Sequence, residues 1–232
     1  MDDARAWDER LGWAYGLIAD DPGERAAALE RLAAERKKVD SALGRFNEAW
    51  STANRLELEG DARCRDVLWS GAYEEYKRVK GHVLPDALWD GEQHDEGAVP
   101  WPGLPYALLF LEWEARYPEE WTRHAKAWGT KQAVIRDLAK AAVGGDPVVR
   151  AKLIDLVEVV VRRAYRCKDR EYVRVARAVD GDELRDRLGR ARDSENPWAR
   201  LHAGYVLWLL DRPEVPNTRH VWRTWLETAA AP

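Results

Sequence analysis

The stretch DPVVRAKLIDLVEVVVRRAYR, residues 146–166, contains the features that decide the fold. Asp146 is a residue type that caps helices, and Pro147 follows at the first helical position, where no backbone N–H is needed. Apolar side chains then recur at helical spacing. The valine-rich segment 157–161 is typical of strands when taken alone, but it lies inside this capped pattern. We therefore predict one helix from residue 146 to about residue 166.

Two other stretches begin in the same way, namely DPGERA at 21–26 and NPWARL at 196–201. Each has a capping Asp or Asn, then a proline, and then an arginine four residues after the cap. The cap accepts a hydrogen bond from a free backbone N–H of the first turn. We expect each arginine to reach an acidic residue on a neighbouring helix pair.

Helical periodicity extends over most of the remaining chain. The segment 22–59 is either one helix or two helices that are broken at Asp40-Ser41, and Asn217 is the expected cap of the last helix. No segment gives a convincing strand pattern. We predict an all-α fold of about ten to twelve helices. The other expected helices span residues 3–19, 62–80, 106–117, 119–128, 130–143, 169–179, 182–192 and 197–211.

Composition limits the class of protein. The chain has 232 residues, 46% of them apolar, which suffices for a core, and only two cysteines, which exclude a disulfide framework. We find no secretory leader at the N-terminus and no apolar stretch that would span a membrane. We predict a single all-helical cytoplasmic domain over 1–232, which is either undivided or subdivided into N-terminal helices 1–80, an irregular loop 81–105 and helices 106–232.

Tryptophan is unusually frequent, with thirteen residues against two phenylalanines. These indoles either fill the core in place of Phe and Leu, or form anchors for a partner. Charge is also uneven, because residues 1–149 carry a net charge of −8 and residues 150–232 a net charge of +4. The arginine-rich region 162–192 suits an anionic partner, but interleaved acidic residues also fit solvated helix faces. We expect weak or no binding of duplex DNA.

The segment GHVLPDALWDGEQHDEGAVPWPGLP, residues 81–105, holds four of the eleven prolines. Loops of this length inside domains are usually functional or disordered, and the segment is equally consistent with a disordered or merely connecting loop. Its indoles lie among carboxylates, a combination that suits a basic partner or a cationic ligand. The candidate binding residues here are Trp89, Asp90, His94, Asp95, Glu96 and Trp101.

Motifs for chemistry are missing from the sequence. It contains no nucleophile elbow, phosphate-binding loop or dinucleotide motif, and no two of the five histidines lie three or four residues apart. We predict no catalytic residue, metal or cofactor. Three further candidate binding residues, Trp198, Arg200 and His202, lie on one apolar helix, where the histidine is either a satisfied core residue or a functional group.

The repeated helix starts resemble those of HEAT-like proteins, best over about residues 146–230. The resemblance implies an irregular α-solenoid whose stacked helix pairs form a concave face for another protein or a nucleic acid. One HEAT-like branch, the alkylpurine DNA glycosylases, has about this length and holds an acidic residue between aromatic rings. Trp89-Asp90 and Trp113-Glu114 are compatible with such a site. The alternative fold is a compact multi-helix bundle.

Three functions fit the sequence. The first is a protein-binding protein, either an adaptor or an immunity-type inhibitor. The second is a DNA-acting enzyme that resembles the HEAT-like glycosylases. The third is a small-molecule enzyme, which requires Trp89, Trp101 or Trp198 to line a cavity that contains a titratable group.

Overall fold

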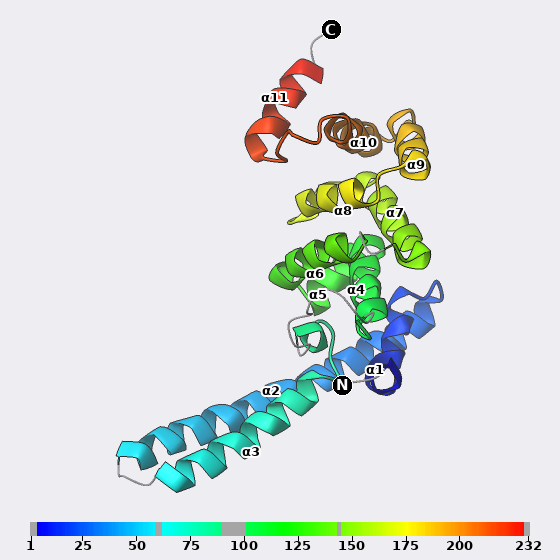
Figure 1. Cartoon of the computed structure of the whole chain (residues 1–232). Coiled ribbons are helices and arrows are strands. Elements are labelled where there is room, and N and C mark those ends of the chain that lie inside the picture. The colour runs from blue at the N-terminus through cyan, green and yellow to red at the C-terminus, as the bar shows by residue number, and fades with distance from the viewer. Residues whose placement is uncertain (1–3, 59–61, 90–100, 143–144, 230–232) are drawn as a thin grey trace. The chain divides into compact units, whose positions relative to one another are not determined.

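The computed structural model describes residues 4–58, 62–89, 101–142 and 145–229. Within these residues it contains eleven α-helices, several short 3₁₀ helices and no strand, which confirms the predicted all-α fold. The chain divides into two units, the N-terminal unit (Met1–Lys126) and the C-terminal unit (Ala127–Pro232), both drawn in Figure 1. The single domain with divisions near residues 80 and 105 stays a prediction.

The N-terminal unit is dominated by a long helical hairpin. In Figure 1 its two helices, α2 and α3, lie side by side, and no break occurs at Asp40-Ser41. The Ser41 hydroxyl instead donates a hydrogen bond to the carbonyl of Lys37 inside the helix, at 2.8 Å. The elements are α1 (Ala4–Leu11), η1 (Gly12–Ile18), α2 (Pro22–Leu58), α3 (Ala62–Lys80), η2 (Asp86–Trp89), α4 (Leu104–Arg116) and α5 (Pro118–His124).

The first predicted helix, 3–19, is only half correct. It is α-helical to Leu11 and continues as the 3₁₀ helix η1. Because a 3₁₀ helix has three residues per turn, Leu11, Ala14 and Leu17 align on one face, and all three are 0% exposed. An α-helical periodicity would have placed Ile18 inward, but Ile18 is only partly buried.

The core of the N-terminal unit forms around α4, which buries nine of its thirteen residues. Phe110 of α4 packs against Trp121 of α5 with ring centroids 5.7 Å apart. Part of the predicted loop 81–105 belongs to this unit's buried interior, because Val83 and Leu84 are 0% exposed. That part therefore contributes apolar packing as well as connection.

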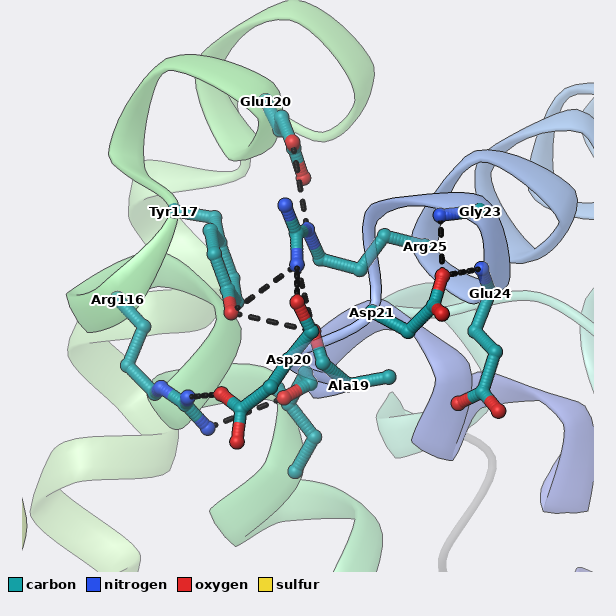
Figure 2. Close-up of polar contacts among 10 residues, drawn as sticks. Ala19, Asp20, Asp21, Gly23, Glu24, Arg25, Arg116, Tyr117 and Glu120 are labelled. Atoms are coloured by element: carbon teal, nitrogen blue, oxygen red, sulfur yellow. Dashed lines mark hydrogen bonds and ion pairs between the residues drawn. The ribbon is translucent and has the colours of Figure 1, made fainter.

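The first of the three capped helix starts organises polar contacts within this unit (Figure 2). Asp21 accepts hydrogen bonds from two backbone N–H groups of the first turn of α2. Arg25 donates to two carbonyl oxygens that follow η1 and to the Tyr117 hydroxyl, and its Nε lies 3.7 Å from the Glu120 carboxylate. Here the expected contact between arginine and an acidic residue is confirmed. Arg116 pairs in the same place with the carboxylate just before Asp21.

The C-terminal unit is a packed series of shorter helices. Helix α8 packs on α6 and α7, and α10 packs on α7, α8 and α9. The elements are α6 (Trp128–Ala141), α7 (Pro147–Val161), η4 (Asp169–Glu171), α8 (Tyr172–Ala178), α9 (Asp182–Arg192), α10 (Pro197–Leu210) and α11 (Arg219–Ala229). Helix α7 ends five residues earlier than predicted, and the chain then turns through 162–171.

The two other capped starts are confirmed in this unit. Asp146 and Asn196 each accept hydrogen bonds from two backbone N–H groups of the first turn of α7 and α10. The arginines differ from expectation. Arg150 donates to the backbone carbonyls of Val179 and Asp180 rather than to a carboxylate, which satisfies carbonyl groups at the end of α8. Arg200 is exposed.

Candidate functional site

A cavity of about 490 Å³ lies within the C-terminal unit. Its walls come from the second half of α7, the turn and helix start at 165–173, one face of α10, and residues 217–222 at the start of α11. Most of the lining side chains are aliphatic or aromatic. Site volumes of roughly 300–1,000 Å³ with mainly apolar walls are typical of small-molecule pockets.

Helix α10 presents one continuous face to the cavity. The lining residues of this helix are Trp198, Leu201, His202, Tyr205 and Val206, a spacing of three and four residues that places all of them on one side. Helix α7 faces the cavity with Val157, Val160 and Val161. Valine is short and branched, so these positions leave the space opposite α10 open.

Aromatic rings form the most polarisable part of the wall. The imidazole of His202 lies between Trp198 and Trp222, at centroid distances of 5.9 and 6.2 Å. Tyr205 meets Trp222 edge to face at 4.6 Å. Trp198 is 47% exposed and Tyr165, across the cavity lining, is 58% exposed. The two exposed rings give a ligand apolar surface where the cavity meets solvent.

His202 is an uncharged part of this wall. Burial lowers the pKa of its imidazole below the ordinary value of 6.5, while hydrogen bonding to the backbone of Val161 and of Arg163 acts in the opposite direction. The imidazole is therefore neutral at neutral pH. Because the ring packs against the indoles of Trp198 and Trp222, it is held in place as part of the wall.

The turn that follows α7 is held by a buried ion-pair network. Lys131, which is 0% exposed, pairs with Asp169 at 2.6 Å, and Arg163 pairs with the other Asp169 oxygen at 2.8 Å. The backbone N–H of Arg166 also donates to this carboxylate, at 2.7 Å. Asp169 lines the cavity, but its charge is compensated by two cations.

A second carboxylate secures the same turn. Burial of Glu171 favours its neutral form, but hydrogen bonds from Arg136, Gln132 and Arg174 outweigh this effect and lower the pKa of the carboxyl. The Gln132 amide and the Arg136 guanidinium both come from α6. Helix α6 thus fixes the position of the segment that carries the cavity wall.

Asn217 connects three parts of the lining. The Tyr205 hydroxyl donates to its Oδ1 at 3.0 Å, and its Nδ2 donates to the carbonyl of Arg170 at 2.7 Å. The prediction that Asn217 caps α11 is wrong, because the backbone N–H of Val221 donates to Thr218 instead. Asn217 therefore joins the turn at 170 to α10 and fixes the residues that follow it.

The structure separates the predicted binding residues into different units. Trp198 and His202 line the cavity, whereas Arg200 lies on the same helix and does not line it. Trp101 is half-buried in the N-terminal unit, where it meets Trp7 edge to face at 5.8 Å over Gly103. Only the backbone of Trp89 is described, at the end of η2, and the other predicted residues of that loop, Asp90, His94, Asp95 and Glu96, lie outside the described residues.

Of the seventeen lining residues, only Trp198 and His202 were singled out as binding residues from the sequence. The missed residues include Tyr165, Arg170, Arg219 and Trp222. The first three lie in or next to turns, where no periodicity indicates which way a side chain points. A signal did exist on α10, because Trp198 and His202 share their helical face with Leu201, Tyr205 and Val206.

Comparisons with known proteins add no family. No protein-family model, curated protein or solved structure matches the chain. Among the residues that the structure describes, no helix is both long and apolar enough to cross a membrane. In the same residues, no three His, Cys, Asp or Glu side chains are grouped so as to hold a metal ion.

Proposed function

We propose that the chain is a binding protein whose C-terminal unit takes up an apolar, partly aromatic small molecule in the 490 Å³ cavity. The cavity itself carries this proposal: it is bounded by the apolar face of α10 and by the valines of α7, and exposed indole and phenol rings lie in its lining. A few polar groups in a largely apolar pocket are the usual arrangement for orienting such a ligand.

Two observations favour binding over catalysis. The Asp169 carboxylate is paired with two cations, and the imidazole of His202 is packed between two indoles. A general acid or base must instead be free to exchange a proton with the substrate. The alternative function is a small-molecule enzyme. Trp198 meets the requirement for it, because this residue lines a cavity that contains a titratable group.

The arginine-rich region offers little support for a DNA-acting enzyme. Six of its arginines form ion pairs with carboxylates of this unit: Arg162, Arg163, Arg174, Arg185, Arg187 and Arg192. Paired guanidinium groups are less available to phosphates, which supports solvated helix faces. A protein partner at loop 81–105, HEAT-like repeats over 146–230 and a cytoplasmic location stay predictions from the sequence.

Fluorescence of the neutral probe N-phenyl-1-naphthylamine tests the proposal, because its emission rises in apolar surroundings. The variant Leu201→Trp fills the cavity, and Leu207→Trp is the matched control on the same helix but outside the lining. We expect saturable binding by the wild type, a dissociation constant raised about tenfold or more in Leu201→Trp, and an unchanged value in the control. Absence of binding by the wild type, or equal loss in both variants, would overturn the proposal.

A further inference from the structure

We infer that the ligand of this cavity is an apolar monoanion, an acid whose apolar body enters the cavity and whose anionic group binds Arg170 and Arg219. This inference rests on the proposed function. Both arginines line the cavity and are exposed. Within the described part of the chain, neither guanidinium forms a hydrogen bond or an ion pair.

Arg170 and Arg219 differ from neighbouring arginines, which form ion pairs with carboxylates of the protein. Neighbouring arginines of the same turn are neutralised within the protein, Arg163 by Asp169 and Arg174 by Glu171. The one carboxylate that lines the cavity is that of Asp169, and Lys131 and Arg163 already occupy it. Among the described lining residues, no acidic side chain is therefore left for Arg170 and Arg219, and both guanidinium groups keep their positive charge at the cavity.

The backbone places these two arginines in one region of the lining. The amide of Asn217 donates to the carbonyl of Arg170, and Arg219 follows Asn217 by two residues. Thr218, between them, also lines the cavity. A guanidinium presents a planar set of N–H donors that matches a carboxylate or sulfonate, so two such groups suit one monoanion.

The other lining residues indicate which chemistry the rest of the ligand should have. It is aliphatic on α7 and aromatic on α10 and α11, and the imidazole of His202 adds no charge at neutral pH. A charged group placed deep in such a wall would lose its hydration without compensation. The anionic group consequently belongs at the arginines and the apolar body against Val160, Leu201 and Trp222.

A pair of probes with one ring system isolates the anionic group. 1-Anilinonaphthalene-8-sulfonate carries a sulfonate, and N-phenyl-1-naphthylamine is its neutral counterpart. In the double variant Arg170→Gln/Arg219→Gln we expect the affinity for the sulfonate to fall about tenfold or more, since two charge-assisted contacts are lost. The affinity for the neutral probe should stay within about twofold, since the apolar wall is intact.

The control is Arg200→Gln/Arg223→Gln, which removes two exposed arginines of α10 and α11 that do not line the cavity. Both affinities should match the wild type in this variant. An unchanged affinity for the sulfonate in the Arg170/Arg219 variant, or an equal loss of both probes, would overturn the inference and leave the proposed function standing. Failure of the neutral probe to bind the wild type would instead count against the proposed function.

Displacement distinguishes an aliphatic from an aromatic acid. Dodecanoate and 2-naphthoate should displace the bound sulfonate probe at lower concentrations than their neutral counterparts, dodecanol and 2-naphthamide. The more effective acid identifies the body that the wall prefers. Displacement by the neutral compounds at the same concentrations as the acids would overturn the inference.

Discussion

A pair of tryptophans in the N-terminal unit and a pair in the C-terminal unit have opposite surroundings. In the N-terminal unit Trp113 and Trp121 are 0% exposed, and Phe110 packs against one of them, so that the indoles fill the space between α4 and its neighbours. In the C-terminal unit Trp198 and Trp222 lie beside a cavity. A tryptophan thus either fills the core or lines a cavity, depending on the size of the side chains on the facing helix.

The facing residues account for the difference. Opposite the aromatic face of α10, the helix α7 presents valines, which are too short to reach across. Around α4 the facing groups are large, and dispersion contacts surround each ring. Trp121 has the ring of Phe110 against it, whereas Trp198 and Trp222 line the cavity together with the valines of α7.

The largest expected effect is on stability, and it tests whether buried and cavity-lining tryptophans contribute differently to the free energy of unfolding. Trp113→Ala should lower the free energy of unfolding by about 3–5 kcal/mol, because it opens a void in a filled core. Trp198→Ala should cost less than about 1 kcal/mol, since the ring is already half in solvent. Urea unfolding followed by circular dichroism measures both. Similar losses in the two variants would break the comparison.

A second prediction concerns the buried ion pair between Lys131 and Asp169, which holds the turn that carries part of the cavity wall. Lys131→Met should destabilise the C-terminal unit by about 3 kcal/mol, because it leaves Asp169 buried with one cation fewer. The matched control is Arg136→Met, which removes an exposed partner of Glu171 while other partners remain, and its effect should be smaller. Thermal melts give the ranking, and a larger loss in the Arg136 variant would contradict it.

Local rules predicted most of the fold. Caps and prolines located the starts of α2, α7 and α10, and periodicity gave α3, α9 and the deeply buried α4. The rules failed where tertiary contacts decide. Residues 12–18 tighten into a 3₁₀ helix, and α7 ends at Val161, where the carboxylates of the following turn pair with residues of α6.

The candidate site was predictable only in part. Trp198 and His202 could be chosen because they share the apolar face of a capped helix. The cavity in front of them depends on the distance between α10 and α7, which no residue of either helix encodes alone. Arg170 and Arg219 come from separate turns, and the side chain of Asn217 joins their segments through long-range hydrogen bonds.

The smallest expected effect is the pH response of the cavity wall. The pKa of His202 in the folded protein lies below its ordinary value of 6.5, chiefly because of burial. The unfolded state therefore binds the proton more readily, and stability should fall as the pH drops below about 6.5 and be constant above it. In His202→Gln this contribution disappears, so the difference in melting temperature between variant and wild type should shift in favour of the variant from pH 8 to pH 5.

His82 and His124 also have pKa values below 6.5, but both proteins retain them, so their contribution cancels in the difference. A difference that does not change with pH would place the imidazole outside the apolar wall and weaken the contrast between the two units.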